Sequence, residues 1–388
     1  MLEKLNNDCW LEIIKYLSLK DQIALYEAFK GISSNFMYHV VFAWEHQRCF
    51  SLDPDCYAKF KEMPELLDIF LSSIKATQEM QFHWVTLEFL KLWENYTFPS
   101  IKRLEYTLDE DLSNINEGDA DEALTIMTKI FPGLQSVLPT GDFDCSTLVK
   151  LTQLRKLDLS EWTPFCRPYH CIDELTKCPL IEELRLKYYE HFTDSYEALM
   201  AMPKMHTVSF YMYYPNDILA SILSKRLLDV HKITFSHCIY MFRMPNLHKL
   251  KNLLQLTLLY EISFPCEKLI EMIANFKELE QLDLICCEMM LNEAELWQTV
   301  DCCPSLRILN IYNMHLKEDF FDGNRCVMEK TLSNRSQDLT LNCDTTREIE
   351  MLMRQLFKHP RLKLSFVPLP HELDGGRIKV HFEPLLPS

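Results

Sequence analysis

Glycine is scarce in this chain, whose 388 residues include only seven. An average composition of about 7% glycine would give about four times as many. A dinucleotide-binding loop needs three glycines within six residues, and a phosphate-binding loop needs two glycines followed by lysine. A nucleophile elbow needs glycine on both sides of a serine. None of these spacings occurs, and the metalloprotease motif His-Glu-x-x-His is also absent. The sequence therefore predicts a protein that is not an enzyme and needs no cofactor.

Cys-x-x-Cys pairs are also missing, although the chain contains fifteen cysteines. An odd number cannot pair completely in disulfides, and buried thiols are common in proteins of reducing compartments. Cys166, His170, Cys171 and Cys178 lie close together and offer a zinc-binding alternative. Structural zinc sites favour short, paired ligand spacings. We therefore favour core packing for these side chains and expect no metal and no disulfide.

Long apolar runs and an excess of basic charge are missing as well. No apolar stretch reaches the roughly 18–20 residues that span a bilayer. The first twenty residues carry acidic and amide side chains, unlike a secretory signal peptide. The formal net charge is −16, which argues against a nucleic acid bound through its phosphates. We expect a cytoplasmic or nuclear protein with no membrane or nucleic-acid partner, and no basic localisation run decides between the two compartments.

Acidic residues are concentrated in one stretch, residues 105–122, which contains no lysine or arginine. Two interpretations stand beside each other: a docking surface for a basic partner or a cation, and a solvated loop between structural elements. The second is favoured because charge runs are usually solvated. The spacing of a calcium-binding loop is absent.

A repeat dominates the centre of the sequence. The pattern apolar-x-x-apolar-x-apolar begins seven times, at intervals of 27, 24, 25, 23, 26 and 27 residues. The seven triplets are Leu154/Leu157/Leu159, Ile181/Leu184/Leu186, Met205/Val208/Phe210, Val230/Ile233/Phe235, Leu253/Leu256/Leu258, Leu279/Leu282/Leu284 and Leu306/Leu309/Ile311. A period of 20–29 residues with this pattern is typical of leucine-rich repeats.

Amphipathic helical patterns lie between the triplets. Leu269, Met272, Ile273 and Phe276, for example, have the spacing that gives one apolar stripe on a helix. Each repeat is therefore predicted to be a strand followed by a helix, and stacked neighbours complete a core that one repeat cannot form alone. The predicted fold class is α/β: a leucine-rich-repeat solenoid with the shape of a horseshoe.

The repeat pattern weakens toward both ends of the chain. Partial or altered matches occur at Ile101/Leu104/Tyr106, at Leu134/Val137 with Pro139 in the third position, at Leu339/Leu341 and at Leu362/Leu364/Phe366. Terminal repeats are atypical because they cap the core. We predict leucine-rich repeats over 101–370, and a helical linker with degenerate first repeats over 51–100. We expect a tail over 371–388 that packs along the array or hangs free.

The first fifty residues have a different character. Leu11, Ile14 and Leu17 share one face of a predicted helix, a second helix follows Asp21, and residues 35–50 form a third helical stretch. Three helices of this length bury little apolar area by themselves. Such a module is more stable when another surface covers it.

These residues resemble an F-box. Leu5, Ile13, Tyr16, Leu17, Asp21 and Leu25 match the pattern of that family in order and spacing, whereas Asn6 and Asp8 replace its usual proline and glutamate. Together with the repeats, and with Cys-Pro pairs ahead of two triplets, the chain is similar to the F-box/leucine-rich-repeat family. In this comparison residues 1–50 are the F-box module.

The resemblance implies a substrate receptor of an SCF-type cullin-RING ubiquitin ligase. In that family the F-box docks on a Skp-family adaptor, and the repeats hold a protein target for ubiquitination. By their position in the pattern, Leu5, Ile13, Leu17 and Leu25 are the predicted adaptor-binding residues. The alternative is a leucine-rich-repeat interaction scaffold without a role in a ubiquitin ligase, its N-terminal helices acting only as a cap. An F-box should carry a second apolar surface that needs a partner, whereas a cap should be apolar only toward the first repeat.

A target site is predicted on the concave face of the sheet. Because side chains of a strand alternate between faces, the residue after each triplet should point outward. The resulting column is Ser160, Lys187, Tyr211, Ser236, Leu259, Ile285 and Tyr312. Contiguous exposed apolar residues mark binding sites. We therefore predict that Tyr211, Leu259, Ile285 and Tyr312 bind the protein substrate.

Overall fold

The computed structural model divides into two compact units, Met1–Glu182 (unit 1) and Glu183–Ser388 (unit 2). It describes residues 7–30, 34–109, 118–162, 171–187, 193–211, 226–236, 249–259, 266–286, 292–312, 320–322, 325–367 and 378–383. No helix in these ranges combines the length and the apolar composition that crossing a bilayer requires.

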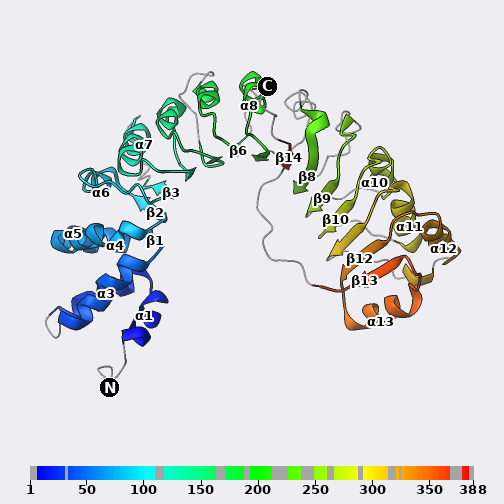
Figure 1. Ribbon diagram of the computed structural model, residues 1–388, viewed down its shortest axis with the longest axis horizontal. Coiled ribbons are helices and arrows are strands. Elements are labelled where there is room, and N and C mark those ends of the chain that lie inside the picture. Colours follow the sequence, from blue (N-terminus) through cyan, green and yellow to red (C-terminus); the bar gives the residue numbers. More distant parts are fainter. Residues whose placement is uncertain are drawn as a thin grey trace. The chain divides into compact units, whose positions relative to one another are not determined.

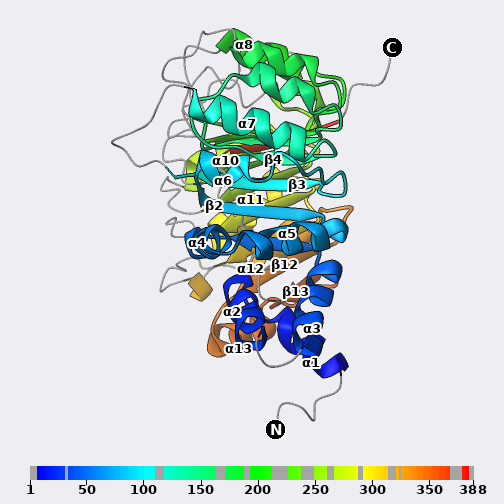
Figure 2. The ribbon, with the colours of Figure 1, turned by 90° about the vertical axis from the view of Figure 1, so that its left-hand side faces the viewer.

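Unit 1 contains a parallel sheet whose strands follow the order of the chain. The strands are β1 (Cys49–Leu52), β2 (Glu79–Val85), β3 (Arg103–Leu108), β4 (Ser136–Leu138) and β5 (Lys156–Leu159). Between them lie the helices α4 (Pro54–Glu62), α5 (Pro64–Ser73), α6 (Leu87–Lys91) and α7 (Asp119–Ile130), and the 3-10 helices η3 (Cys145–Lys150) and η4 (Cys171–Lys177). The α-helices lie on one side of the strands (Figures 1 and 2). In each unit, the side of the strands opposite the helices is called the open face below (Figure 1).

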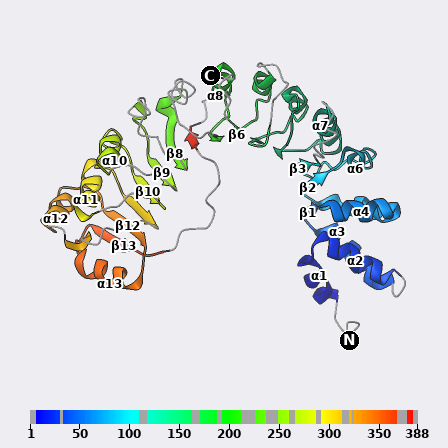
Figure 3. The same ribbon diagram turned by 180° about the vertical axis from the view of Figure 1, so that it is seen from behind.

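Three helices precede this sheet, as the sequence pattern predicts: α1 (Asn7–Lys15), α2 (Leu19–Phe29) and α3 (Ser34–His46). Figure 3 shows them next to β1. Their shared core contains a polar centre, the fully buried amide of Gln22. The indole Nε1 of Trp44 donates to Gln22 Oε1 at 2.7 Å, and Gln22 Nε2 donates to the carbonyls of Ile14 and Leu17 at 3.1 and 3.0 Å. One side chain thus joins all three helices.

The array of strands begins earlier than the repeat pattern indicates. β1 starts at Cys49, at the junction of the helical module with residues 51–100, and β2 lies within residues 51–100, for which the sequence predicted a helical linker with degenerate first repeats. Both pair in parallel with their neighbours. The reason is the leading position of the triplet. Phe50/Leu52 and Met80/Phe82 fill its last two apolar positions, but the residues three positions before Phe50 and Met80 are the polar Gln47 and Thr77, so the apolar triplet does not detect these strands.

Unit 2 continues the strand-and-helix pattern. Its strands are β6 (Glu183–Lys187), β7 (Thr207–Tyr211), β8 (Val230–Ser236), β9 (Gln255–Leu259), β10 (Gln281–Ile285), β11 (Ile308–Tyr312), β12 (Leu339–Asp344), β13 (Leu362–Ser365) and β14 (Ile378–Phe382). Its helical elements are α8 (Thr193–Met200), η6 (Leu227–Asp229), α10 (Cys266–Ile273), α11 (Glu293–Cys302), η9 (Phe320–Asp322), α12 (Arg325–Ser333) and α13 (Arg347–Leu356). The partial matches at 339–341 and 362–366 are therefore strands.

The register of unit 2 aligns the predicted triplets. Leu282 of β10 lies opposite Leu256 of β9 and Leu309 of β11, and Leu284 is aligned with Leu258 in the same way. All of them are buried. Full burial of a leucine side chain contributes about 1.5–3 kcal/mol. Because this contribution recurs in every repeat, the aligned triplets form a continuous core, and the leucine-rich-repeat architecture is confirmed by the strands themselves.

The last strand corrects the predicted tail. Within residues 371–388, β14 is a strand of the sheet, antiparallel to both β7 and β8 and lying between them (Figure 1). Ile378, Val380 and Phe382 are buried. Their apolar-x-apolar-x-apolar alternation is visible in the sequence, but it lacks the leading apolar residue of the repeat pattern.

Replacing Gln22 by Leu should destabilise the N-terminal helices. The change leaves the buried indole of Trp44 without its acceptor, and an unsatisfied buried donor costs about 1–3 kcal/mol. Urea unfolding followed by tryptophan fluorescence measures the loss. The control is Gln355→Leu, the same substitution at an exposed position of α13. Equal stability of the two variants would contradict a structural role for the buried amide.

Candidate protein-binding surfaces

The predicted adaptor-binding residues are only partly accessible. Ile13 is 43% exposed, whereas Leu17 and Leu25 are half-buried. Leu5 lies outside the described residues. The largest exposed side chain of this region is one that the prediction left out: Tyr16 is 87% exposed. Its place in the family pattern could have identified it. Ile13 and Tyr16 are three positions apart, the spacing of neighbours on one side of a helix.

The opposite side of these helices is tightly packed. Trp10, Ile14 and Ile23 are buried, and the ring of Trp44 lies 5.3 Å from Phe70 of α5 in an edge-on arrangement. From the sequence, the face of Leu11, Ile14 and Leu17 was expected to need another surface to cover it, and for Ile14 this was wrong. Ile14 is fully buried because it points into the core that contains Gln22. The helices therefore have one apolar side in the core and a second at Ile13 and Tyr16.

The predicted target column has the expected register from β6 to β7 and from β8 to β11, but β14 lies between β7 and β8 and separates Tyr211 from Ser236. Lys187 lies opposite Tyr211, Ser236 opposite Leu259, and Leu259, Ile285 and Tyr312 follow one another across β9, β10 and β11. Ser160 follows β5 directly and is half-buried. The side chain of Tyr211 lies outside the described residues.

The exposure expected of this column was wrong at four positions. Ser236, Leu259, Ile285 and Tyr312 are only 2%, 3%, 3% and 5% exposed. The last three pack into one apolar cluster with Cys286 against it. Burial, followed by the negative charge of Asp283, raises the pKa of the Tyr312 hydroxyl. Strand alternation determines the face on which a side chain lies, but not whether that face is covered. As they stand, these side chains are core.

Polar side chains lie beside this cluster on the same strands. We call Gln255, Thr257, Gln281, Asp283, Asn310 and Asn342 the polar ladder. Asp283 is 5% exposed and accepts four hydrogen bonds. The donors are Gln255 at 2.9 Å, Thr257 at 2.7 Å, Gln281 at 2.8 Å and Asn310 at 2.5 Å. Asn342 donates to Asn310 at 2.5 Å and extends the ladder to β12.

The polar ladder is a preorganised hydrogen-bonding surface. Its outer amides, those of Gln255, Gln281 and Asn342, are half-buried and therefore reachable by a partner. The buried carboxylate holds Gln255 and Gln281 directly and Asn342 through Asn310, because an amide that is hydrogen-bonded in such a network loses rotational freedom. The signal in the sequence is the polar residue between the last two apolar positions of successive triplets: Thr257, Asp283, Asn310 and Asn342.

The sheet of unit 1 carries an exposed aromatic residue that the sequence did not indicate. Trp84 is 60% exposed and has φ +58°, in the left-handed region that bulky residues rarely adopt. The register of β2 with β3 shifts here, between Phe82 and Val85, and the backbone N–H of Trp84 donates to Thr107 Oγ1 at 2.8 Å. Such strain is frequently found at functional positions.

The two remaining candidates from the sequence are the cysteine cluster around Cys178 and the acidic stretch 105–122. Cys178 is buried, and burial raises the pKa of its thiol to about 11. Cys166 and His170 lie outside the described residues, as does the side chain of Cys171. In the acidic stretch, Asp121 accepts from the backbone of Asp144 at 2.6 Å, and residues 110–117 are not described. In the part of the chain that the structure describes, no group of His, Cys, Asp or Glu side chains is arranged to hold a metal.

Comparisons with known proteins give structural neighbours alone. No family model matches the sequence, and no curated protein matches it significantly. A leucine-rich-repeat protein of Leptospira interrogans aligns at 12% identity over 85% of this chain and 98% of its own, with a TM-score of 0.37. An internalin of Listeria monocytogenes aligns at 12% identity over 91% and 96%, with a TM-score of 0.30. The repeat architecture rests on the strand register, and scores this low carry no functional argument.

Replacing Ile285 by Ala should destabilise unit 2. Removing a buried isoleucine side chain costs about 2–5 kcal/mol, because the lost transfer free energy adds to the cost of the cavity. Chemical unfolding measures it. Ile308→Ala, at a half-buried isoleucine of β11, is the matched control and should lose less. If Ile285→Ala were as stable as the wild type, the Ile285 side chain would be accessible and not part of the core.

Replacing Trp84 by Gly should cost no stability. Glycine adopts φ +58° without strain, which offsets its greater loss of backbone entropy, so we expect a change between zero and about 1 kcal/mol of stabilisation. Thermal and urea unfolding check it. Phe82→Gly, at a fully buried position of the same strand, should lose several kcal/mol, as large core deletions do. A marked loss for Trp84→Gly would mean that the ring supports the fold rather than a contact.

Proposed function

We propose that this chain is the substrate-recognition subunit of an SCF-type cullin-RING ubiquitin ligase. In this proposal residues 1–50 act as an F-box that docks a Skp-family adaptor, and the leucine-rich repeats bind a protein target. The chain contributes no catalytic residue and no cofactor; it holds a target lysine near the charged ubiquitin carrier. The complex acts in the cytoplasm or the nucleus.

The observation that carries the proposal is the second apolar side of the N-terminal helices. Trp10 and Ile14 of α1 point into the core, whereas Ile13 is 43% exposed and Tyr16, just after α1, is 87% exposed. Tyr38 of α3 is 60% exposed as well. An exposed tyrosine combines a large apolar area with a polar hydroxyl, and this residue type is enriched among the dominant contacts of interfaces. A partner that covers these side chains would gain their apolar area.

The competing function is a leucine-rich-repeat scaffold whose N-terminal helices only cap the array. A cap needs one apolar side, the side that Trp44 packs against Phe70. It gives no reason for Ile13 and Tyr16 to be exposed together. The exposed pair therefore favours the adaptor-binding function over the cap.

The target surface in this proposal is the open face of the repeats. Because Leu259, Ile285 and Tyr312 are buried, we no longer assign target binding to them. The half-buried amides of the polar ladder take that place in the proposal. Amide groups held by a buried carboxylate recognise the backbone and polar side chains of a protein segment. Trp84 supplies a separate exposed aromatic contact on unit 1.

Replacing Tyr16 by Asp should abolish binding of the Skp adaptor. The change removes the most exposed apolar ring and introduces a charge that the interface would have to desolvate, so affinity should fall at least 30-fold, equivalent to about 2 kcal/mol or more. Titration of the purified chain with a Skp-family adaptor, by calorimetry, measures the change. Because Tyr16 has few contacts within the chain, the melting temperature should stay close to that of the wild type.

The matched control is Met351→Asp, which places the same charge at an exposed apolar residue of α13 in unit 2. It should bind the adaptor like the wild type. If the wild-type chain binds no Skp adaptor, or if Tyr16→Asp binds as tightly as Met351→Asp, the adaptor-binding function is wrong and the scaffold remains.

A further inference from the structure

β14 occupies a position that the repeat does not require. Elsewhere in unit 2, the strands from β8 to β13 pair in parallel with the next strand in the chain. Between β7 and β8, which are also successive, the antiparallel β14 is inserted and pairs with both. Neighbouring strands lie about 4.8 Å apart, so β7 and β8 are separated by about twice that spacing. The two strands thus form a slot one strand wide, with two edges that pair with whatever fills it.

The slot accepts a defined side-chain pattern. Ile378 lies between Phe210 and Phe235, and Val380 lies between Val208 and Ile233. These residues are buried, while the alternating Lys379 and His381 are half-buried on the other face. The slot therefore takes an extended segment in which every second residue is apolar.

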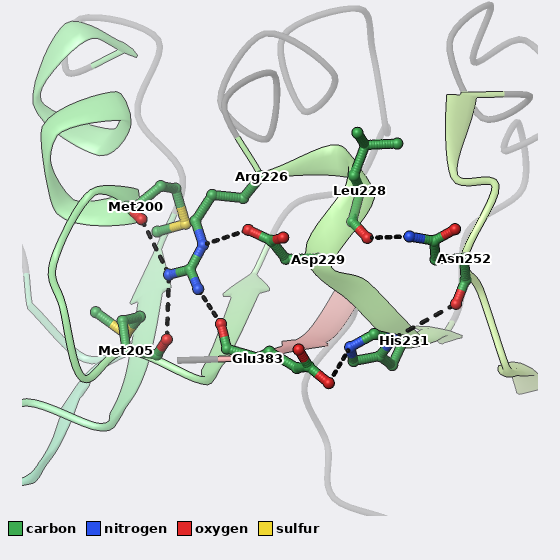
Figure 4. A network of polar contacts seen from close by, with 8 residues as sticks. All are labelled: Met200, Met205, Arg226, Leu228, Asp229, His231, Asn252 and Glu383. Carbon is green, nitrogen blue, oxygen red and sulfur yellow. Dashed lines mark hydrogen bonds and ion pairs between the residues drawn. The ribbon is translucent and has the colours of Figure 1, made fainter. Parts of the chain in front are cut away.

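Arg226 holds the end of that segment (Figure 4). Its guanidinium is buried, with 2% of the side chain exposed, and it lies 4.1 Å from the centre of the Phe382 ring. It donates to the carbonyls of Met200 at 3.2 Å and Met205 at 3.1 Å, and also to the carbonyl of Glu383. Arg226 thus recognises an aromatic ring and a backbone carbonyl, two features that many segments could offer.

Arg335 provides a comparison for Arg226, because it is a second buried arginine that donates to backbone carbonyls, at a place where no strand is inserted. Its guanidinium donates to the carbonyls of Val300 at 2.9 Å, Cys303 at 3.0 Å and Leu306, all from one preceding repeat. Around Arg226 the preceding repeat supplies Met200 and Met205, and β14 supplies the remaining carbonyl. Burial lowers the pKa of both arginines. The cluster of Arg226 differs in that β14 contributes one acceptor and the ring of Phe382, and in that Arg226 Nε also lies 3.4 Å from the carboxylate of Asp229.

The open-face side of the slot is sensitive to protonation. His381 Nδ1 lies 3.0 Å from Thr207 Oγ1, which also lies 3.0 Å from His206 Nδ1. Burial lowers the pKa of His381 to about 4, and Lys379, Lys232 and His206 act in the same direction, while Glu183 opposes them. The ordinary histidine pKa is about 6.5. The docked strand therefore binds fewer protons than the free one, so docking is fully favourable above about pH 6.5 and weakens as the pH falls toward 4.

β14 reaches the slot as a tethered segment. It follows β13, which lies six strand spacings away in the order of the sheet, about 29 Å at 4.8 Å each. Eleven residue steps separate Val367 from Ile378, and a chain of this length spans at most about 36–40 Å. Docking within one chain is thus within reach. A tether of this kind supplies a millimolar effective concentration, so a partner segment at a lower concentration replaces β14 only if it binds the slot correspondingly more tightly.

We propose that the slot between β7 and β8 is a peptide-binding site, which β14 fills within the chain. When β14 leaves, the slot takes an extended segment of a partner protein that carries the same pattern, apolar-x-apolar-x-aromatic. The partner segment enters antiparallel to β7 and β8, adds its backbone to both edges as in other cases of strand addition, and places its aromatic residue against Arg226. This site does not depend on the adaptor-binding function.

A cleavable tether tests the proposal on the full chain. A specific protease site is placed within residues 368–377, the chain is cut, and a fluorescent peptide of residues 374–388 is added. We expect the cut protein to stay folded and the labelled peptide to replace the cleaved segment in a saturable way. A peptide with Val380→Asp should bind at least 100-fold more weakly. If the cut chain unfolds, or if no labelled peptide is taken up at any concentration, β14 is an integral part of the core and the proposal is wrong.

Two arginine variants test the recognition. In the cut chain, Arg226→Met should weaken peptide binding at least tenfold. The Glu383 carbonyl of the peptide loses the guanidinium that donates to it, and the Phe382 ring loses its contact with the same group. Arg335→Met removes an equivalent buried arginine and should leave peptide affinity unchanged. Equal effects of the two would mean that Arg226 acts on stability alone, which would overturn its assigned role.

The pH dependence and the identity of the occupant complete the test. Peptide binding should be about 30-fold weaker at pH 5 than at pH 7.5, and a His381→Thr peptide should lose this dependence.

A randomised peptide library panned on the cut chain should select the apolar-x-apolar-x-aromatic pattern; selection of peptides without this pattern would overturn the ligand class. Sedimentation of the uncut chain should give a monomer, since a dimer with exchanged β14 strands would assign the slot to a second copy instead of a partner.

Discussion

The structure depends on one constraint: a single repeat cannot bury its own apolar strand face. Leu256, Leu282 and Leu309 are buried because each stands in register with the next, and a helix covers them on one side. Aligning the strands aligns every other residue of the repeat as well. The polar ladder and the cluster of Leu259, Ile285 and Tyr312 are columns produced by the same register. Core and surface features of the repeats thus have a common origin.

The same constraint makes an uncovered end of the array unfavourable in free energy, because an end strand would expose its apolar face and its unpaired backbone. At the amino end, α1–α3 pack on the first repeat through Trp44 and Phe70. This contact uses only one side of the helices. Ile13 and Tyr16 remain exposed on the other side, and the capping role of the helices leaves them unexplained. Capping and partner binding are therefore compatible in one small module, since they use different residues.

β14 shows how a parallel array tolerates an exception. An antiparallel strand satisfies the backbone of β7 and β8 as well as a parallel strand would, and its alternation presents Ile378 and Val380 to the same core. The consequence is that β7 and β8 lie two strand spacings apart. Arg226 connects the segments on either side by donating to the carbonyls of Met205 and Glu383. A buried guanidinium is suited to this because its fixed fork of donors satisfies several carbonyls at once.

The sequence by itself determined the repeat, its strand positions and the three N-terminal helices, because these follow from local apolar spacing. It also determined the register of the target column on each side of β14, which is the triplet register shifted by one residue. Tertiary structure alone decided the burial of Leu259, Ile285 and Tyr312, since coverage of a strand end depends on segments that alternation does not describe. It likewise decided the start of the array at β1, where the polar Gln47 stands at the leading position of the triplet, and the insertion of β14 beside strands more than a hundred residues earlier in the chain. The physical reason is the range of the interactions: spacing along the chain specifies which face a residue occupies, whereas partners distant in sequence specify what that face meets.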